Sequence, residues 1–77
     1  MTPEELAEVS KVRALARSGS ARAIRLAAGI TLGEVAASVG CSHSAVFRWE
    51  AGERKPMGRR ALRYAAVLDA LLSRRAR

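Results

Sequence analysis

The sequence is poor in the residues on which several functional classes depend. It has one cysteine, one histidine, and one each of tryptophan, tyrosine and phenylalanine among 77 residues. A single cysteine, Cys41, excludes an internal disulfide, and a lone histidine makes a bound metal ion unexpected. No run of about 18 apolar residues is present, so a membrane span is not expected. The opening residues "MTPEELAEVS" lack the apolar core of a secretory signal, so we expect a protein of the reducing cytoplasm.

Signals for catalysis and for β-structure are also scarce. The sequence shows no Ser/His/Asp or Cys/His arrangement, no paired-carboxylate site and no glycine-rich loop that would hold phosphates. We therefore expect no enzyme, no cofactor and no small-molecule ligand. β-Branched residues are scattered and no alternating segment persists, which favours an all-α fold.

Positive charge is what the sequence has in excess. Lysine and arginine total 14 against 7 acidic residues, the formal net charge is +7 and the sequence pI is about 11.3. Such a charge in a small domain points to an anionic partner, nucleic acid first and a membrane surface second. Arginine outnumbers lysine twelve to two, a bias that a GC-rich genome also produces. A membrane is the weaker interpretation, because the arginines of the last helical segment stand at its ends rather than along one face.

Capping residues recur along the chain and predict five helices. Thr2 and Thr31 each begin an S/T-x-x-E capping box, and Pro3 suits the first position of a helix. Ser20 and Ser42 are predicted N-caps. The predicted helices span residues 3–17, 21–28, 32–39 and 43–51, and the last helix runs from Met57 or Gly58 to about Ser73.

Glycines and apolar spacing complete this pattern. Gly29 suits the left-handed position that follows a helix, Gly40 permits a tight turn with positive φ, and Gly52 is predicted to end the fourth helix. In the first helix the predicted apolar stripe consists of Leu6, Val9, Val12 and Ala16.

Residues 32–50 meet the requirements of two short helices that cross after a tight connection. A small residue is needed where the backbones approach, and Ala36 is placed there; Gly40 supplies the left-handed turn. Apolar side chains must fill the angle between the helices, and the candidates are Val35, Val39, Cys41, Val46 and Trp49. The set predicts a helix-turn-helix, with Cys41 as a small core residue rather than a redox sensor.

Residues 22–56, "RAIRLAAGITLGEVAASVGCSHSAVFRWEAGERKP", resemble the phage-repressor and Cro type of helix-turn-helix domain, the Xre-like family of bacterial and phage regulators. The matching positions are Arg25, Gly29, Thr31, Glu34, Val35, Ala36, Gly40, Ser42, Val46, Trp49, Glu50, Gly52, Arg54, Lys55 and Pro56. The resemblance implies a repressor-like helical domain over residues 20–73. An extra N-terminal helix and turn over residues 1–19 precede it, and residues 74–77 form a basic tail. Leu32 departs from the family, since relatives often carry a glutamine there that holds a phosphate.

The resemblance also implies a set of DNA contacts. Base contacts are expected from the side of the fourth helix that faces away from Val46 and Trp49, namely His43, Ser44, Phe47 and Arg48. Phosphate contacts are expected from Thr31, Ser42, Arg54 and Lys55. Arg22, Arg59, Arg60 and the tail arginines stay open between phosphate contacts and plain solvated surface. Arg25 and Glu50 match a pair that forms a partly buried salt bridge in the family, and we interpret it as structural.

Two side chains on this helix have alternative interpretations. Phe47 could pack half-buried against the last helix, and His43 could be an ordinary solvated residue. Trp49 is expected in the core, where the family usually has isoleucine or leucine.

The implied function is sequence-specific binding of double-stranded DNA, by a transcriptional repressor of phage, prophage or plasmid type at the nucleoid. We expect a homodimer, because one reader helix covers only a few base pairs. We place the dimer surface on the last helix, because Leu68, Leu71 and Leu72 are more apolar residues than the core of one short domain needs. The acidic N-terminal helix is the alternative location. The alternative function is a protein-interaction module of antitoxin or anti-repressor type, which the extra helix and the missing glutamine favour.

Overall fold

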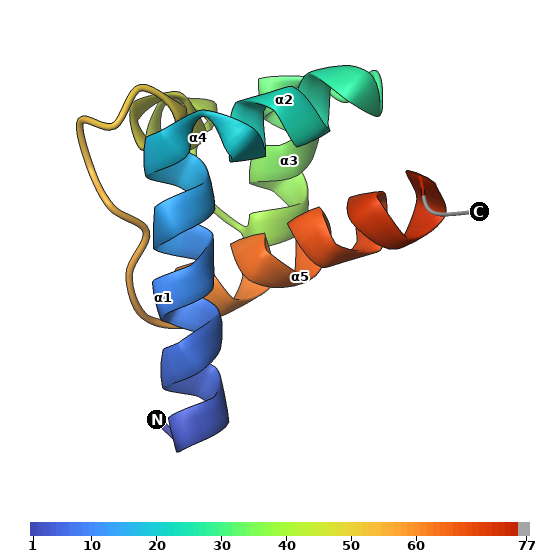
Figure 1. Ribbon diagram of the computed structural model, residues 1–77. Helices are drawn as coiled ribbons and strands as arrows, with labels where there is room; N and C mark the ends of the chain where they lie inside the picture. The colour runs from blue at the N-terminus through green and yellow to red at the C-terminus, as the bar shows by residue number, and fades with distance from the viewer. Residues whose placement is uncertain (76–77) are drawn as a thin grey trace.

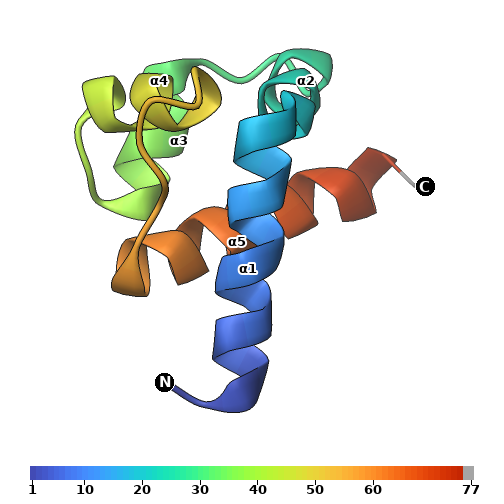
Figure 2. The same cartoon turned by 60° about the vertical axis from the view of Figure 1, so that its left-hand side comes forward.

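Five helices follow one another in a computed structural model that describes residues 1–75 (Figure 1). They are α1 (Pro3–Ser18), α2 (Ser20–Ala27), α3 (Leu32–Val39), α4 (His43–Glu50) and α5 (Gly58–Arg75). The all-α prediction is confirmed, and residues 1–75 contain no strand. The two long helices, α1 and α5, cross, and the three short helices gather toward the C-terminal end of α1 (Figures 1 and 2).

The predicted starts at Pro3, Leu32 and His43 are confirmed, and the boundaries that differ do so by one or two residues. The Thr2 hydroxyl accepts the Glu5 N–H at 3.1 Å, while the Thr2 N–H donates to the Glu5 carboxylate at 2.9 Å. Gly29 adopts φ 72°, and the Ile30 N–H beyond it donates to the Arg25 carbonyl at 3.1 Å, which closes the end of α2. At the other end of the chain, α5 continues past the predicted Ser73 to Arg75, and residues 76–77 of the predicted tail lie outside the described residues.

The predicted cap at Ser20 is wrong. Gly19, with φ 89°, is both the C-cap of α1 and the N-cap of α2, so Ser20 is already the first helical residue. One left-handed residue joins the two helices, which leaves no extended position in which a serine could cap α2. Instead, the Ser18 hydroxyl accepts the Ser20 N–H at 3.3 Å.

The core is continuous through all five helices. Trp49 of α4 and Tyr64 of α5 form its aromatic pair, with ring centroids 4.9 Å apart. The predicted filling of the helix-turn-helix angle is confirmed, with Cys41 only partly buried at its edge. The buried apolar residues are Val9, Val12, Ala16, Ala21, Ile24, Val35, Ala36, Val39, Val46, Trp49, Ala61, Tyr64, Ala65 and Leu68. Because α1 supplies three of them, the N-terminal helix and the helix-turn-helix share one core.

Two apolar side chains lie elsewhere than their sequence pattern indicates. Leu6 is 57% exposed, because the first turns of α1 extend beyond its crossing with α5 (Figure 2). Leu68 is 1% exposed, so the interior of the domain needs it and it is not surplus. Of the three leucines assigned to a dimer surface, Leu71, which is partly buried, and Leu72, which is 36% exposed, remain at the surface of the last helix.

Candidate nucleic-acid interface

The outer side of α4 carries the four residues expected to contact bases. His43, Ser44, Phe47 and Arg48 are all exposed, whereas Val46 and Trp49 on the opposite side are buried. Phe47 is 54% exposed. It borders a groove that Arg22 of α2 and Leu32 of α3 also line. The helix therefore presents polar groups together with one aromatic side chain.

The N-terminus of α4 is open to solvent. The Ser42 hydroxyl caps the helix by accepting the Ala45 N–H at 3.2 Å, and Ser42, His43 and Ser44 are exposed. The first amides of a helix have no acceptor within the helix, so they are suited to bind an anionic oxygen. Ser42 and Ser44 can add their hydroxyl groups to such a contact.

A basic groove runs beside α4 and brings residues from three segments together. Ser42, Ser44 and Arg48 line it from α4 and its cap, Arg54 and Lys55 from the following loop, and Arg60 from the start of α5. No carboxylate is among the residues of this groove, which we call the α4 groove. Arg60, which the sequence left open between phosphate contact and solvated surface, thus lies with the residues of the candidate interface.

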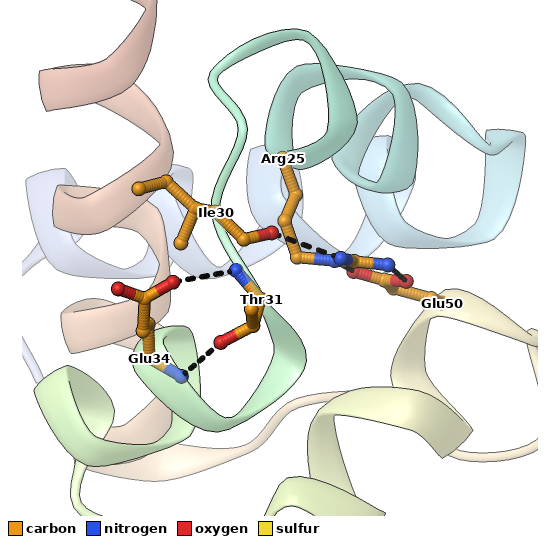
Figure 3. Close-up of polar contacts among 5 residues, drawn as sticks. All are labelled: Arg25, Ile30, Thr31, Glu34 and Glu50. Carbon is orange, nitrogen blue, oxygen red and sulfur yellow. Dashed lines mark hydrogen bonds and ion pairs between the residues drawn. The ribbon is translucent and has the colours of Figure 1, made fainter.

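An ion pair holds α4 at its C-terminal end. The Arg25 Nε donates to Glu50 Oε2 at 2.6 Å and its second terminal nitrogen to Oε1 at 2.9 Å, while the remaining nitrogen donates to the Ile30 carbonyl at 3.0 Å (Figure 3). The two side chains are only 10% and 5% exposed. The hydrogen bonds to Glu50 raise the pKa of Arg25. The pair therefore joins α2, the loop before α3 and α4 in one fixed arrangement.

The capping box of α3 limits what Thr31 can offer a phosphate. Its N–H already donates to Glu34 Oε1 at 2.9 Å, and its hydroxyl oxygen accepts the Glu34 N–H at 3.0 Å (Figure 3). The Thr31 N–H that donates to the carboxylate, and after it the Thr31 side chain, lower the pKa of Glu34, so a carboxylate stands at the start of α3. The Thr31 hydroxyl proton and the next amides are what remain for a phosphate oxygen.

Leu32, at the position where relatives often have glutamine, is an apolar substitute. Its side chain packs against the core and shares the groove with Phe47. A polar anchor at the start of α3 is therefore replaced by an apolar surface beside the outer side of α4.

The loop that carries Arg54 and Lys55 is held at both ends. At its start, Gly52 adopts φ 74° and the Glu53 N–H donates to the Arg48 carbonyl at 3.0 Å. At its end Pro56 is buried, and its carbonyl accepts a hydrogen bond from Arg13 Nε of α1 at 2.8 Å. Two exposed cations are thereby fixed beside α4.

Sequence reasoning missed three contributors to this arrangement. Arg13 belongs to the helix outside the motif, and its partner lies 43 residues away. Arg63 donates to the Val39 carbonyl at 3.4 Å, beside the turn. Tyr64 is 1% exposed and its hydroxyl has no hydrogen-bond partner among the described residues. Its burial, with Glu50 nearby, raises its pKa. An aromatic residue at the correct helical spacing was the available signal for Tyr64; Arg13 and Arg63 had none.

One of the comparisons with known proteins found a match, and it covers most of the chain. A family model described as helix-turn-helix matches residues 22–72. Neither the curated proteins nor the solved structures contain a match to this chain. Over residues 1–75, no three His, Cys, Asp or Glu side chains gather as they would to hold a metal ion. No helix in that part of the chain has the length and apolar character needed to cross a membrane.

Proposed function

The chain belongs to the Xre-like helix-turn-helix family of DNA-binding transcription regulators, and from this premise we propose that it is a sequence-specific repressor of phage, prophage or plasmid type. The observation that carries the proposal is the exposed side of α4, where His43, Ser44, Phe47 and Arg48 stand over a buried inner side. A helix of this kind enters the major groove and presents three or four side chains to base edges.

The four side chains have different roles in this proposal. Arg48 pairs with a guanine through two hydrogen bonds, an interaction worth about 1–3 kcal/mol of discrimination against other bases. Phe47 packs on a thymine methyl group, for which its exposed ring, supported by Leu32, is suited. His43 and Ser44, at the start of α4, reach polar base edges or an adjacent phosphate.

Affinity in this proposal comes from the α4 groove. Arg54, Lys55 and Arg60 bind backbone phosphates, together with Ser42 at the start of the helix. Thr31 adds a hydroxyl contact at the start of α3. Since such contacts release counterions, they supply affinity without sequence information and make it depend on salt.

The regulator acts as a homodimer in this proposal, and we place the contact on α5. The outer side of that helix carries Ala66, Val67, Ala70 and Leu71, which border an apolar groove with Arg63 and with Ser38 of α3. Two copies would present their α4 helices to half-sites about 34–36 Å apart.

Selection from randomised duplex DNA tests the proposal. The wild-type protein and an Arg48→Ala variant are taken through parallel rounds at about 150 mM salt, the range in which specific binding competes with non-specific binding. We expect a two-fold symmetric site for the wild type, and relaxed preference at one position of each half-site for Arg48→Ala. Salt-sensitive binding without enrichment, equal in both proteins, would contradict sequence reading.

A protein-interaction module is the second candidate, and one observation favours it. The Phe47 and Leu32 side chains form an exposed apolar surface in the position of the usual polar anchor. A stoichiometric complex with a partner protein that high salt and Arg48→Ala leave intact would support this candidate over DNA binding.

A further inference from the structure

The helix that precedes the family match has an uneven charge. The first half of α1 holds Glu4, Glu5 and Glu8, whereas the second half holds Lys11, Arg13 and Arg17. Lys11 pairs with Asp69 at 2.9 Å, and Arg13 donates to the Pro56 carbonyl. Arg17 is exposed, and no carboxylate of the described residues lies within ion-pair distance of it.

A second groove lies on the other side of the loop from the α4 groove. Arg13 and Arg17 line it from α1, and Glu53, Arg54 and Lys55 line it from the loop, over an apolar floor that includes Trp49. Its four cations face one carboxylate, so the groove is positively charged. Figure 2 shows the loop descending between α4 and the side of α1. Arg54 and Lys55 border both grooves, which makes the cationic surface continuous from α4 to α1.

We propose that α1 extends the DNA interface, with Arg17 binding a backbone phosphate next to those held by Arg54 and Lys55. This rests on the proposed function, since it requires α4 to lie in the major groove. A DNA strand carries a phosphate about every 3.4 Å along the helix axis. A strand that passes over the loop therefore continues along the second groove, where Arg17 of α1 is exposed and forms no ion pair with an acidic residue among the described residues.

In this arrangement Arg13 is a positioning residue. Its guanidinium holds the Pro56 carbonyl, and through it the end of the loop, against α1. The N-terminal helix thus has two tasks: it fixes the basic loop, and it adds a phosphate contact outside the bases that α4 reads. The predicted footprint is wider than that of residues 22–72 alone.

Arg17→Gln tests the proposal, with Arg74→Gln as the matched control. Arg74 is also exposed, but it lies on α5 near the C-terminus, on the opposite side of the molecule from the loop (Figures 1 and 2). Binding to the selected duplex and to an unrelated duplex is measured at salt concentrations from about 50 to about 300 mM. Over this range the affinity of a protein that contacts phosphates depends strongly on salt. Arg17→Gln is expected to weaken binding to both duplexes by the same factor. It should also reduce the slope of log K against log salt by about 1, as loss of one phosphate contact does.

One further variant and one further measurement separate this role from a structural one, because Arg17 also lies in the last turn of α1, where a cation favours the helix dipole. Arg17→Lys should restore the wild-type salt slope, and phosphate-ethylation interference should lose a position flanking the half-site in Arg17→Gln only. An unchanged slope in Arg17→Gln overturns the inference. If Arg48→Ala still relaxes the selected site in that case, DNA reading by α4 stands; if the wild type binds no duplex, both fail.

Discussion

Truncating Glu50 to alanine is expected to destabilise the fold more than any other single change outside the apolar core. The variant leaves the Arg25 side chain, which is 10% exposed, with only the Ile30 carbonyl as a hydrogen-bond partner. Removing one partner of a buried ion pair costs about 3–5 kcal/mol, because the other charge stays buried without compensation. At roughly 0.05–0.15 kcal/mol per residue, a domain of this length has a total free energy of unfolding of about 4–12 kcal/mol.

The expected loss is therefore a large part of the whole stability. In a domain of this size about 1 kcal/mol lowers Tm by ~4–8 °C, so Glu50→Ala should lower Tm by at least ~12 °C. Circular dichroism during heating measures the shift, and urea titration gives the free energy of unfolding. Lys11→Met, which breaks the exposed pair with Asp69, is the control and should change Tm much less.

A double variant distinguishes charge burial from general damage. Arg25→Met with Glu50→Leu replaces both charges by apolar side chains, which is often neutral or stabilising. The double variant should recover most of the Tm lost in Glu50→Ala. A Glu50→Ala variant that melts within ~4 °C of the wild type would refute the reasoning, since it would show that the Arg25 charge is not buried in solution.

Three further predictions concern the turn, a cap and the aromatic pair. Gly40→Ala should lose at least ~1–2 kcal/mol of unfolding free energy, because the residue has φ 85° and the new Cβ would lie 3.1 Å from Arg63; an unchanged urea midpoint would contradict this. The lowered pKa of Glu34 stabilises the folded state above the ordinary value of 4.5, and this contribution is lost as pH falls through the folded pKa. Glu34→Gln should accordingly flatten the fall of Tm between pH 7 and pH 3, and a slope equal to the wild type would show that Glu34 contributes nothing to the pH dependence of stability. Tyr64→Phe removes a buried hydroxyl that has no partner among the described residues, so it should raise stability by about 1 kcal/mol; a lower Tm would show that the hydroxyl is hydrogen-bonded.

Much of the fold was predictable because its signals are local. A capping box is read from residues three apart, and both boxes form as expected. The spacing of Val35, Ala36 and Val39 follows from the helical repeat, and Gly40 follows from the left-handed turn that only glycine adopts at low cost. The predicted N-cap at Ser20 was wrong for an equally local reason, since either Gly19 or Ser20 can occupy the N-cap position of the same helix.

The candidate interface was predictable within α4 and in the loop that follows it, where the family pattern has Arg54 and Lys55. An amphipathic pattern shows which side of a helix is buried, so the outward direction of His43, Ser44, Phe47 and Arg48 could be expected. The same pattern does not show which distant cations lie beside that helix. Arg17, Arg60 and Arg74 are all exposed, and their neighbours distinguish them.

The sequence alone thus determined where each helix lies to within one or two residues, which of the helix sides are apolar, and that residues 32–50 form a helix-turn-helix. These properties depend on hydrogen bonds and side-chain spacing within a few residues. The tertiary structure decided that α1 joins the same core, that Arg13 holds Pro56, and that cations of α1, the loop and α5 meet beside α4. Such contacts join residues far apart in the chain, and they arise from how whole helices pack, which no local pattern encodes.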